Sequence, residues 1–524
     1  MSLMDGEMQA FALTLDKFLE HAAKWRPTTE IVTAREHGVR ERVEYAALLK
    51  NSRCASAVLT RMGVGLGDHV ATLAWNTQAH VEAWYAIMGL GAVCHTLNPR
   101  LTLAQLAEMV RQSRPRVLVV SADLAPLARQ IRDAARHIEH VLVIDGDAPA
   151  DMAALQPLLA DADYARVQWG AFDETRPAGL CFTSGTTGAP KGVTYTHRSN
   201  YLHALRLLQA DVLAIKASDV VLPAVPMFHA NAWGLPFAAP AAGAKLVLPG
   251  RNIDGASLAT LINAEGVTIA AGVATVWLGL LEHLEAKGGD VATLQRVIVG
   301  GAPLPPALMQ RIEQRLGVTV QTSWGMTELS PGGTFAAPND PARAAAISGR
   351  PAIGVDLLIG DAEGRPLSEQ RNTEGHLFVR GAAVVERYFG AAHSATTADG
   401  WFATGDLAKI DDDGNLMITG RAKDLIKSGG EWINPVEIET VVSRLPEVSL
   451  AAVIGRRDSK WGERPILLVQ TRAEGAISDE DLLAPLRDAV ASWWIPDAVI
   501  RIPKMPLAPT GKIDKIRLRA EYGG

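Results

Sequence analysis

The sequence predicts an α/β protein. We expect a large N-terminal domain of two βαβ-type subdomains plus a β-subdomain, and a small mobile α+β C-terminal domain. Three observations lead to this prediction. The chain has 524 residues, more than one hydrophobic core normally serves. Short apolar runs alternate with helical patterns from about residue 30 to residue 350. Beyond residue 350, tight turns rich in Gly and Asp separate the apolar runs instead.

The alternating region predicts buried parallel strands with helices between them. The runs VLVV (117–120) and VLVI (141–144) flank a helical pattern, ADLAPLARQIRDAARH. Further strands are expected at KLVLP (245–249), VTIAAG (267–272) and LQRVIVGG (294–301), with helices at SLATLINAEG and PALMQRIEQRLG. Such alternation is typical of βαβ units, which form parallel sheets.

The last third of the chain has a different pattern. VDLLIGDAEGRPL, GHLFVRG and LAKIDDDGNLMITG predict the strands of the β-subdomain. A helix at PVEIETVVSRLP, strands at SLAAVIGR and ILLVQTR, and a helix at DEDLLAPLRDAVASWW then predict a separate unit of about 100 residues. We therefore expect domains at 1–420 and 425–524, joined by a hinge at 421–424.

Composition excludes several classes of protein. The chain is 48% hydrophobic and 21% charged, with a net charge of -6, which argues against a nucleic-acid partner. Cys54, Cys94 and Cys181 form no C-x-x-C pair, so neither a disulfide framework nor a zinc site is expected. The longest uncharged run, 220–244, contains four prolines and His229, which disfavours a transmembrane segment. The N-terminus is no secretory signal, and we expect a cytoplasmic protein.

A loop rich in Gly, Ser and Thr, FTSGTTGAPKGV at 182–193, predicts phosphate binding. Glycines let backbone N–H groups approach phosphate oxygens, hydroxyl groups add donors, and Lys191 supplies a positive charge. The loop is not the common P-loop, because Pro190 rather than Gly precedes the lysine. A flexible turn is the alternative, but the length, the hydroxyl density and the apolar run GLCF before the loop favour phosphate binding.

Four further motifs follow, each of them weak in isolation. In SWGMTELSP (323–331), Glu328 could bind a hard cation and Thr327 could contact phosphate. In GWFATGD (400–406), Asp406 could accept hydrogen bonds from a ribose diol, although an ordinary turn is the simpler reading. The last two are GRAKDLIKSGGEWINPVEIE (420–439) and PTGKID (509–514), the second of which contains Lys512.

Taken together, the order and residue sequences of these five motifs resemble those of the adenylate-forming (AMP-binding) superfamily. This superfamily includes acyl-CoA synthetases, luciferases and peptide-synthetase adenylation domains. The resemblance covers essentially the whole chain. It implies that a carboxylate attacks the α-phosphorus of ATP to give acyl-adenylate and pyrophosphate, after which a thiol displaces AMP. It further implies Mg²⁺ as cofactor, ATP and CoA as co-substrates, and a homodimer.

The resemblance also assigns roles to individual residues. Lys512 matches the lysine that bridges the attacking carboxylate and the α-phosphate, with Glu328 and Thr327 as the other catalytic residues. Thr183 and Glu328 match the magnesium-associated pair, and Lys423 lies at the hinge. The implied ATP- or AMP-binding residues are Thr183, Ser184, Gly185, Thr186, Thr187, Gly188, Lys191, Gly301, Ala302, Pro303, Ser323, Trp324, Gly325, Met326, Thr327, Asp406, Arg421 and Lys512. The implied CoA-binding residues are Lys427, Ser428, Gly429, Gly430, Glu431 and Trp432.

The segment PMFHANAWGLPF (226–237) bears on the acid. It has no acidic residue to hold a substrate amine, which argues against an amino acid. It resembles bacterial fatty acyl-CoA synthetases in which a tryptophan gates the acyl tunnel, here Trp233. The implied acyl pocket is formed by His229, Trp233, Val273 and Gly300. SWGMTELSP and SWWIPD (491–496) resemble instead the medium-chain branch that includes methylthiopropionate-CoA ligases.

The function that these resemblances imply is an AMP-forming, ATP-dependent acyl-CoA synthetase, an acid–thiol ligase, acting on a medium- or long-chain fatty acid. Alternatives are a ligase for methylthiopropionate or an aryl acid, and the same fold with a carrier protein or oxygen as acceptor. A non-catalytic nucleotide-binding protein is disfavoured because Lys191, Glu328 and Lys512 are all present. The family usually has Tyr where Trp324 stands, and we expect Trp324 to offer adenine a similar flat face.

Overall fold

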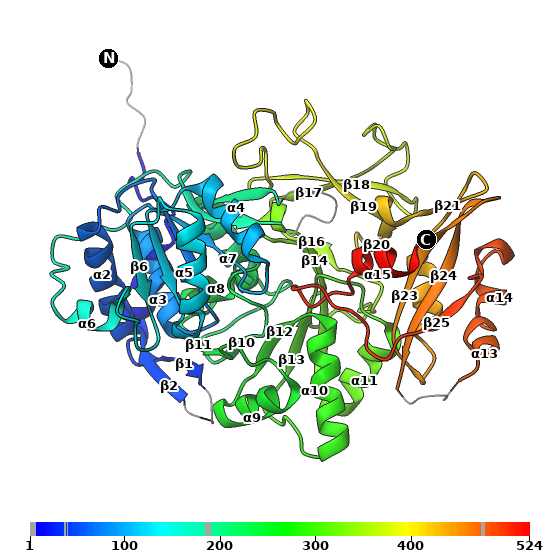
Figure 1. Cartoon of the computed structure of the whole chain (residues 1–524), viewed down its shortest axis with the longest axis horizontal. Coiled ribbons are helices and arrows are strands. Elements are labelled where there is room, and N and C mark those ends of the chain that lie inside the picture. Colours follow the sequence, from blue (N-terminus) through cyan, green and yellow to red (C-terminus); the bar gives the residue numbers. More distant parts are fainter. Residues whose placement is uncertain (1–6, 36–37, 39, 184–189, 473–476) are drawn as a thin grey trace.

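The computed structural model describes residues 7–35, 38, 40–183, 190–472 and 477–524. Two large sheets, a four-stranded sheet and a C-terminal sheet account for the strands in this part of the chain. Figure 1 shows the N-terminal sheet at one end of the long axis, the second large sheet in the centre and the C-terminal sheet at the opposite end. The predicted architecture, a large mixed α/β N-terminal domain followed by a small C-terminal domain, is confirmed.

The first large sheet has the strand order β7-β6-β5-β3-β4-β8-β9. Its strands pair in parallel except for β8 and β9, which form an antiparallel pair around the predicted phosphate loop. Its strands are β3 (His69–Leu73), β4 (Val93–Thr96), β5 (Val117–Val120), β6 (His140–Val143), β7 (Ala153–Ala154), β8 (Pro177–Phe182) and β9 (Gly192–Thr196). The helices along this part are α2 (Tyr45–Arg61), α3 (Gln78–Gly89), α4 (Leu103–Ser113), α5 (Ala125–Ala134) and α6 (Leu155–Ala160).

The second large sheet has the order β16-β15-β14-β13-β12-β10-β11-β1-β2, and β14, β13, β12, β10, β11 and β1 are mutually parallel. Its strands are β1 (Glu30–Ala34), β2 (Arg40–Glu44), β10 (Val220–Pro223), β11 (Lys245–Leu248), β12 (Ile269–Gly272), β13 (Arg296–Val299), β14 (Thr319–Gly325), β15 (Gly332–Phe335) and β16 (Arg350–Pro351). The accompanying helices are α1 (Asp16–Trp25), α7 (His197–Leu208), α8 (Leu235–Ala242), α9 (Gly255–Glu265), α10 (Ala274–Lys287) and α11 (Pro306–Leu316).

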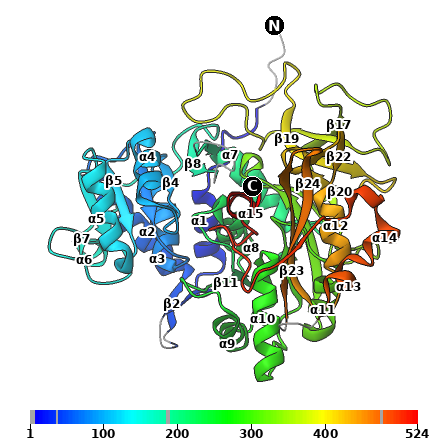
Figure 2. The same ribbon diagram turned by 45° about the vertical axis from the view of Figure 1, so that its right-hand side comes forward.

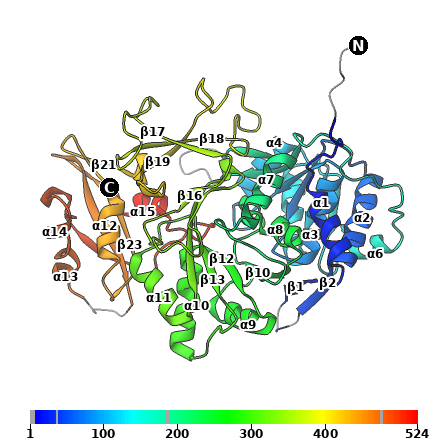
Figure 3. The same ribbon diagram turned by 180° about the vertical axis from the view of Figure 1, so that it is seen from behind.

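The central parallel strands of this second sheet, such as β10 and β12, are continuous apolar runs because both of their faces are covered. Ile269 and Ala271 of β12 pack into one buried cluster, while Ala270 packs into another on the opposite face. Parallel sheets buried in this way favour Val, Ile and Ala over an alternating pattern. Figure 3 shows the same arrangement from behind, with α9, α10 and α11 beside β12 and β13.

The β-subdomain is an antiparallel meander, as the tight turns predicted. Its strands are β17 (Val355–Gly360), β18 (Gly375–Gly381), β19 (Phe402–Ile410) and β20 (Leu416–Arg421). One face packs on Trp324 and Leu329 from the end of the second large sheet. The meander therefore borders the region that follows β14.

The C-terminal domain is built around a long antiparallel pair, β23 (Val448–Asp458) and β24 (Gly462–Thr471). The remaining elements are β21 (Ile426–Ser428), β22 (Glu431–Ile433), α12 (Pro435–Val442), α13 (Asp479–Leu483), α14 (Leu486–Ala489), β25 (Val499–Arg501) and α15 (Lys515–Tyr522). The prediction of one helix over DEDLLAPLRDAVASWW was wrong, since α13 and α14 are separate. Pro485 lies between them, and a proline has no N–H group with which to continue a helix.

The fold sets the place of the site. The C-terminal segment that precedes α15 crosses from the small sheet to the centre of the molecule (Figure 2). In parallel α/β sheets, ligands bind beyond the carboxyl ends of the strands. Val273, Gly300 and Met326 come directly after β12, β13 and β14, so these three positions lie at that edge.

Candidate active site

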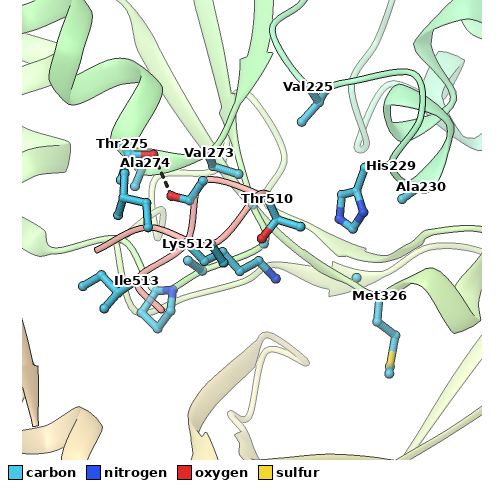
Figure 4. Close-up of a pocket in the computed structure, with 18 of the residues that line it drawn as sticks. Val225, His229, Ala230, Val273, Ala274, Thr275, Met326, Thr510, Lys512 and Ile513 are labelled. Atoms are coloured by element: carbon cyan, nitrogen blue, oxygen red, sulfur yellow. Dashed lines mark hydrogen bonds between the residues drawn. The ribbon is translucent and has the colours of Figure 1, made fainter. Parts of the chain in front are cut away.

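A cavity of about 2000 Å³ lies between the carboxyl ends of β12, β13 and β14 and the C-terminal segment around Lys512. Figure 4 shows the Lys512 side chain extending into this cavity, in the direction of His229 and Met326. The cavity brings together most of the residues expected from the motifs. Those that line it are Thr183, Lys191, His229, Trp233, Val273, Gly300, Gly301, Ala302, Pro303, Ser323, Trp324, Gly325, Met326, Thr327, Glu328, Arg421, Lys423 and Lys512.

The phosphate loop begins and ends on the β8–β9 pair. The N–H of Thr183 donates to the carbonyl oxygen of Lys191 over 2.9 Å, which closes the base of the loop. Lys191 Nζ lies 4.8 Å from the centre of the Tyr388 ring. The other expected loop residues lie outside the described part of the chain, and their roles stay predictions. They are Ser184, Gly185, Thr186, Thr187 and Gly188.

Glu328 lies beside the base of this loop, on a short 3₁₀ turn at Thr327–Leu329. Its side chain is buried, and the hydroxyl of Tyr388 donates to Oε1 over 2.9 Å. Tyr388 thus contacts both Lys191 and Glu328. The hydroxyl of Tyr195 donates to the carbonyl oxygen of Thr327 over 2.8 Å and so holds the same turn.

This donor set fits a magnesium ion bound together with a nucleotide. Among the described residues no group of three or more His, Cys, Asp or Glu side chains is arranged to hold a metal ion. Mg²⁺ usually takes one or two carboxylates from the protein and completes its shell with water and substrate phosphates. Glu328, a single buried carboxylate beside a phosphate loop, matches that requirement.

Asp406 and Arg421 form an ion pair across the β19–β20 ladder, where they face each other in register; the carboxylate is buried and the Arg421 side chain is partly exposed. Arg421 Nε lies 2.9 Å from Asp406 Oδ1, and the indole N–H of Trp324 donates to Oδ2 over 2.8 Å. Asp406 is only 3% exposed, so these two donors compensate for the burial of its charge. The Trp324 ring packs into the core of the β-subdomain. Its expected contact with adenine stays a prediction.

Lys512 is the central cation of the cavity. Burial, together with the nearby charge of Arg421, lowers the pKa of its ammonium group to about 8, while Asp406 opposes the shift. A Cβ atom placed on Gly301 would lie 3.3 Å from Lys512 Cε, which shows how closely the side chain passes the segment after β13. A lysine with a perturbed pKa in a cleft is a candidate functional group.

Gly300, expected in the acyl pocket, stands where a side chain would collide with its neighbours. A Cβ atom on Gly300 would lie 2.6 Å from Ser323 Oγ and 3.3 Å from Trp233 Cη2. Ser323 is held by a hydrogen bond from its hydroxyl to the carbonyl oxygen of Val299, at 3.2 Å. The absence of a side chain at Gly300 therefore leaves room between the ends of β13 and β14.

The expected acyl pocket continues past Trp233. His229 is neutral at physiological pH, because burial lowers its pKa to about 4 and the charge of Lys512 adds to the effect. His203 Nε2 lies 3.0 Å from the carbonyl oxygen of Trp233. Sequence reasoning missed the residues that line this farther part of the cavity, and the only signal was the i, i+4 spacing of two of them on α7. They are His203, Leu207, Leu213, Leu235 and Phe335.

The expected CoA-binding segment is not brought to the cavity in this arrangement of the chain. Lys427, Ser428, Glu431 and Trp432 lie on the β21–β22 hairpin, whose turn is formed by Gly429 and Gly430. Neither these four nor the two glycines line the cavity. Trp432 is 52% exposed, with Lys427 Nζ 5.4 Å from its ring centre.

Fold and site together define an adenylate-forming enzyme: the cavity is bordered by the two ends of the expected phosphate loop, by the buried carboxylate of Glu328, by Arg421 of the Asp406–Arg421 pair and by Lys512 of the C-terminal domain. Comparison with known families agrees. The AMP-binding enzyme model matches residues 18–389, and the AMP-binding enzyme C-terminal domain model matches residues 437–512. The chain belongs to the AMP-binding enzyme family.

Curated relatives extend over essentially the whole chain. A 3-methylmercaptopropionyl-CoA ligase from Ruegeria lacuscaerulensis is 40% identical, with 99% of each chain covered. A medium-chain-fatty-acid–CoA ligase from Ectopseudomonas oleovorans is also 40% identical, over 99% of this chain and 98% of the relative. A long-chain-fatty-acid–CoA ligase from Thermus thermophilus is 40% identical, over 99% of both. The predicted class of enzyme, an acid–thiol ligase, is confirmed.

Among solved structures, the anthranilate CoA ligase AuaEII in complex with anthranoyl-AMP superposes with a TM-score of 0.89. It is 25% identical, and the superposition covers 98% of this chain and 99% of that one. The likeness confirms the predicted fold. In the part of the chain that the structure describes, no helix is both long and apolar enough to cross a membrane.

Proposed function

We propose that this enzyme joins an apolar carboxylic acid to CoA, with cleavage of ATP to AMP and pyrophosphate, and that the acid is a medium- or long-chain fatty acid. The observation that carries the proposal is the position of Lys512. It extends into a cavity that is lined both by Thr183, Lys191 and Glu328 and by the expected acyl-pocket residues His229 and Trp233. A single cation in this cavity can contact both the acid and the nucleotide.

In the first step the carboxylate oxygen of the acid attacks the α-phosphorus of ATP, and the bond to pyrophosphate breaks. Lys512 holds the attacking carboxylate and the α-phosphate together and offsets the charge that develops between them. Its pKa of about 8 leaves it mostly protonated at neutral pH, and the negative charges of both ligands favour the protonated form further. Neutral His229 adds no competing charge on the acyl side.

The nucleotide is held at three points. Thr183 and Lys191, with the loop between them, bind the β- and γ-phosphates, while Gly301 and Ser323 border the adenine. Asp406 accepts hydrogen bonds from the ribose and Arg421 orients it. A magnesium ion bound at Glu328 and Thr183 would supply charge compensation to the departing pyrophosphate.

In the second step the CoA thiol displaces AMP from the acyl-adenylate. The β21–β22 hairpin, 427–432, lies away from the cavity, which supports a rotation of the C-terminal domain about a hinge at 421–424. That rotation withdraws Lys512 and brings the hairpin to the acyl-adenylate. The domain limits of 1–420 and 425–524, a homodimer and a cytoplasmic location belong to the same proposal.

The preference for a fatty acid rests on the apolar extension of the cavity beyond Trp233. Leu207, Leu213, Leu235 and Phe335 line it, so a chain longer than a few carbons would bury apolar surface there. The two 40% identical relatives named for fatty acids support this choice. The relative named for 3-methylmercaptopropionyl-CoA supports a short thioether acid as the second candidate.

The proposal is tested by measuring CoA-dependent AMP release across a panel of acids. The panel contains straight-chain acids from acetate to palmitate, methylthiopropionate and several aryl acids. We expect the highest kcat/KM between about eight and sixteen carbons, because each buried CH₂ group contributes about 0.8 kcal/mol. A maximum at methylthiopropionate or an aryl acid would overturn the fatty-acid assignment. AMP release that needs a carrier protein instead of CoA would overturn the acceptor.

A further inference from the structure

The segment that carries Lys512 is a closed turn. Leu507 and Ile513 pair as an antiparallel bridge, and the N–H of Ala508 donates to the carbonyl oxygen of Lys512 over 2.7 Å. Gly511 has φ +82°, a conformation that favours glycine. We call residues 507–513 the lysine turn. Because the turn is closed by its own hydrogen bonds, its placement as a whole determines where Lys512 points.

Two side chains of the N-terminal domain donate hydrogen bonds to backbone carbonyl groups of this turn. Arg100 Nη1 donates to the carbonyl oxygen of Pro509 over 3.3 Å. The hydroxyl of Thr275 donates to the carbonyl oxygen of Gly511 over 2.9 Å, the bond drawn as a dashed line in Figure 4. These bonds end on either side of the turn's tip, one and three residues before Lys512.

The two donors come from different sheets. Arg100 follows β4 of the first large sheet, whereas Thr275 lies in the first turn of α10, directly after β12 of the second. The turn also approaches the second sheet closely, since a Cβ atom on Gly511 would lie 3.0 Å from Val273 Cγ2. The lysine turn therefore bridges both large sheets at the edge where the cavity opens.

Arg100 is solvent-exposed, yet aromatic rings hold its guanidinium group. The guanidinium carbon lies 5.9 Å from the centre of the Trp75 ring and 5.9 Å from the centre of the Phe228 ring. Trp75 is itself oriented, because its indole N–H donates to Asp123 at 3.0 Å and 3.1 Å. Cation–π contacts of this kind reduce the freedom of a long side chain before it donates.

We propose that Arg100 and Thr275 are positioning residues for Lys512: they dock the lysine turn in the arrangement that serves adenylate formation. This inference rests on the proposed role of Lys512 in the first step. Both hydrogen bonds must break when the C-terminal domain rotates for the second step. The pair therefore shifts the population toward the first arrangement without contacting the reacting atoms.

The test measures the two half-reactions separately in Arg100→Met and Thr275→Val. Each variant keeps side-chain volume against its neighbours and removes the donor. We expect the rate of acid-dependent ATP–pyrophosphate exchange to fall roughly three- to ten-fold in each variant, which corresponds to the usual net contribution of one hydrogen bond. Thioester formation from supplied acyl-adenylate and CoA should stay within about two-fold. Thr275→Ser retains the hydroxyl and should restore exchange.

A second readout does not depend on activity. Hydrogen–deuterium exchange of the amides in 507–513 should become faster in Arg100→Met, because the turn loses an anchor. The matched control is Arg111→Ala, at an exposed arginine on α4 of the same domain that pairs with Glu108. It should leave both the half-reaction and the amide exchange unchanged. In a Lys512→Ala background, adding Arg100→Met should lower the residual pyrophosphate exchange no further.

The outcomes separate this inference from the proposed function. A wild-type enzyme without acid-dependent pyrophosphate exchange would overturn the proposed function itself. If the wild type is active but Arg100→Met changes neither the ATP–pyrophosphate exchange rate nor the hydrogen–deuterium exchange of residues 507–513, the docking role alone is overturned. Equal losses in both half-reactions, or a further loss in the Lys512→Ala background, would also contradict it, since Arg100 would then act on something other than Lys512.

Discussion

At the scale of single residues, the central question is the charge of Lys512. The ammonium group is buried, and the loss of hydration lowers its pKa to about 8. Lysine ordinarily titrates near pH 10.4, so the shift brings its charge change close to physiological pH. A residue that must be cationic to hold a carboxylate and a phosphate together should therefore lose its effect just above neutrality.

We predict a pH limb from this shift. Lys512 is charged below its pKa, so adenylate formation should be present below pH 8 and lost as the pH rises through about 8. The measurement is kcat/KM for acid-dependent pyrophosphate exchange between pH 6 and 10, which reports groups of the free enzyme. Lys512→Arg should shift the limb upward or abolish it, because arginine stays protonated. A limb near 8 that persists in this variant would assign it to another group.

At the scale of elements, the site lies at the carboxyl ends of parallel strands. Apolar runs in the sequence predict where such strands end, so most of the site could be located from the sequence. Val273, Gly300 and Met326 follow three parallel strands, so apolar runs and motifs together indicated one edge of one sheet. The place of Tyr388 in the site was not predicted, because a single tyrosine in an irregular segment belongs to no periodic pattern or motif. The indole N–H bond from Trp324 to Asp406 escaped because it joins residues 82 positions apart. Such pairings depend on packing, which spacing along the chain does not encode.

The turn that carries Trp233 was equally unpredictable. Ala230, Asn231, Ala232 and Trp233 are four successive residues with φ between +46° and +54°. Non-glycine residues rarely adopt this left-handed conformation, which costs about 1–2 kcal/mol for each. The His203 contact to the Trp233 carbonyl group helps to hold the turn. No local composition rule would have predicted it.

Trp233 lines the cavity close to Gly300, and under the proposed acyl pocket Trp233→Ala should change the chain-length preference. We expect the relative kcat/KM for the longest acids to rise, because removing the indole opens the passage to Leu207 and Phe335. The measurement is the acid panel repeated on the variant. An unchanged profile would show that Trp233 does not control passage.

At the scale of the whole molecule, the small C-terminal domain contributes the lysine turn and residues of α12, β23 and α15 to the cavity, and the N-terminal domain contributes the other side. The sheet of the C-terminal domain lies at the far end of the long axis (Figure 1). Sequence motifs indicated both halves of the enzyme, but not their relative placement, which depends on contacts such as those of Arg100 and Thr275. Interfaces between domains of one chain are commonly small and polar enough to permit relative motion.

The hinge proposal predicts an asymmetric effect for Lys423→Pro. Lys423 lies in a short 3₁₀ turn at Ala422–Asp424, and Arg519 of α15 contacts Asp424 at 2.8 Å. Proline fixes φ near -65° and restricts the rotation that a hinge requires. We expect thioester formation to fall about ten-fold or more while pyrophosphate exchange changes little. Equal loss in both half-reactions would place the hinge elsewhere.

The most direct test of the whole account is Lys512→Ala, assayed in two half-reactions on the same preparation. Removing the cationic side chain of the lysine turn should lower acid-dependent ATP–pyrophosphate exchange by about 100-fold or more, because no cation of the turn then offsets the charge of the acid and the nucleotide. Thioester formation from supplied acyl-adenylate and CoA should continue at nearly the wild-type rate. Pyrophosphate exchange at the wild-type rate in Lys512→Ala would contradict the account.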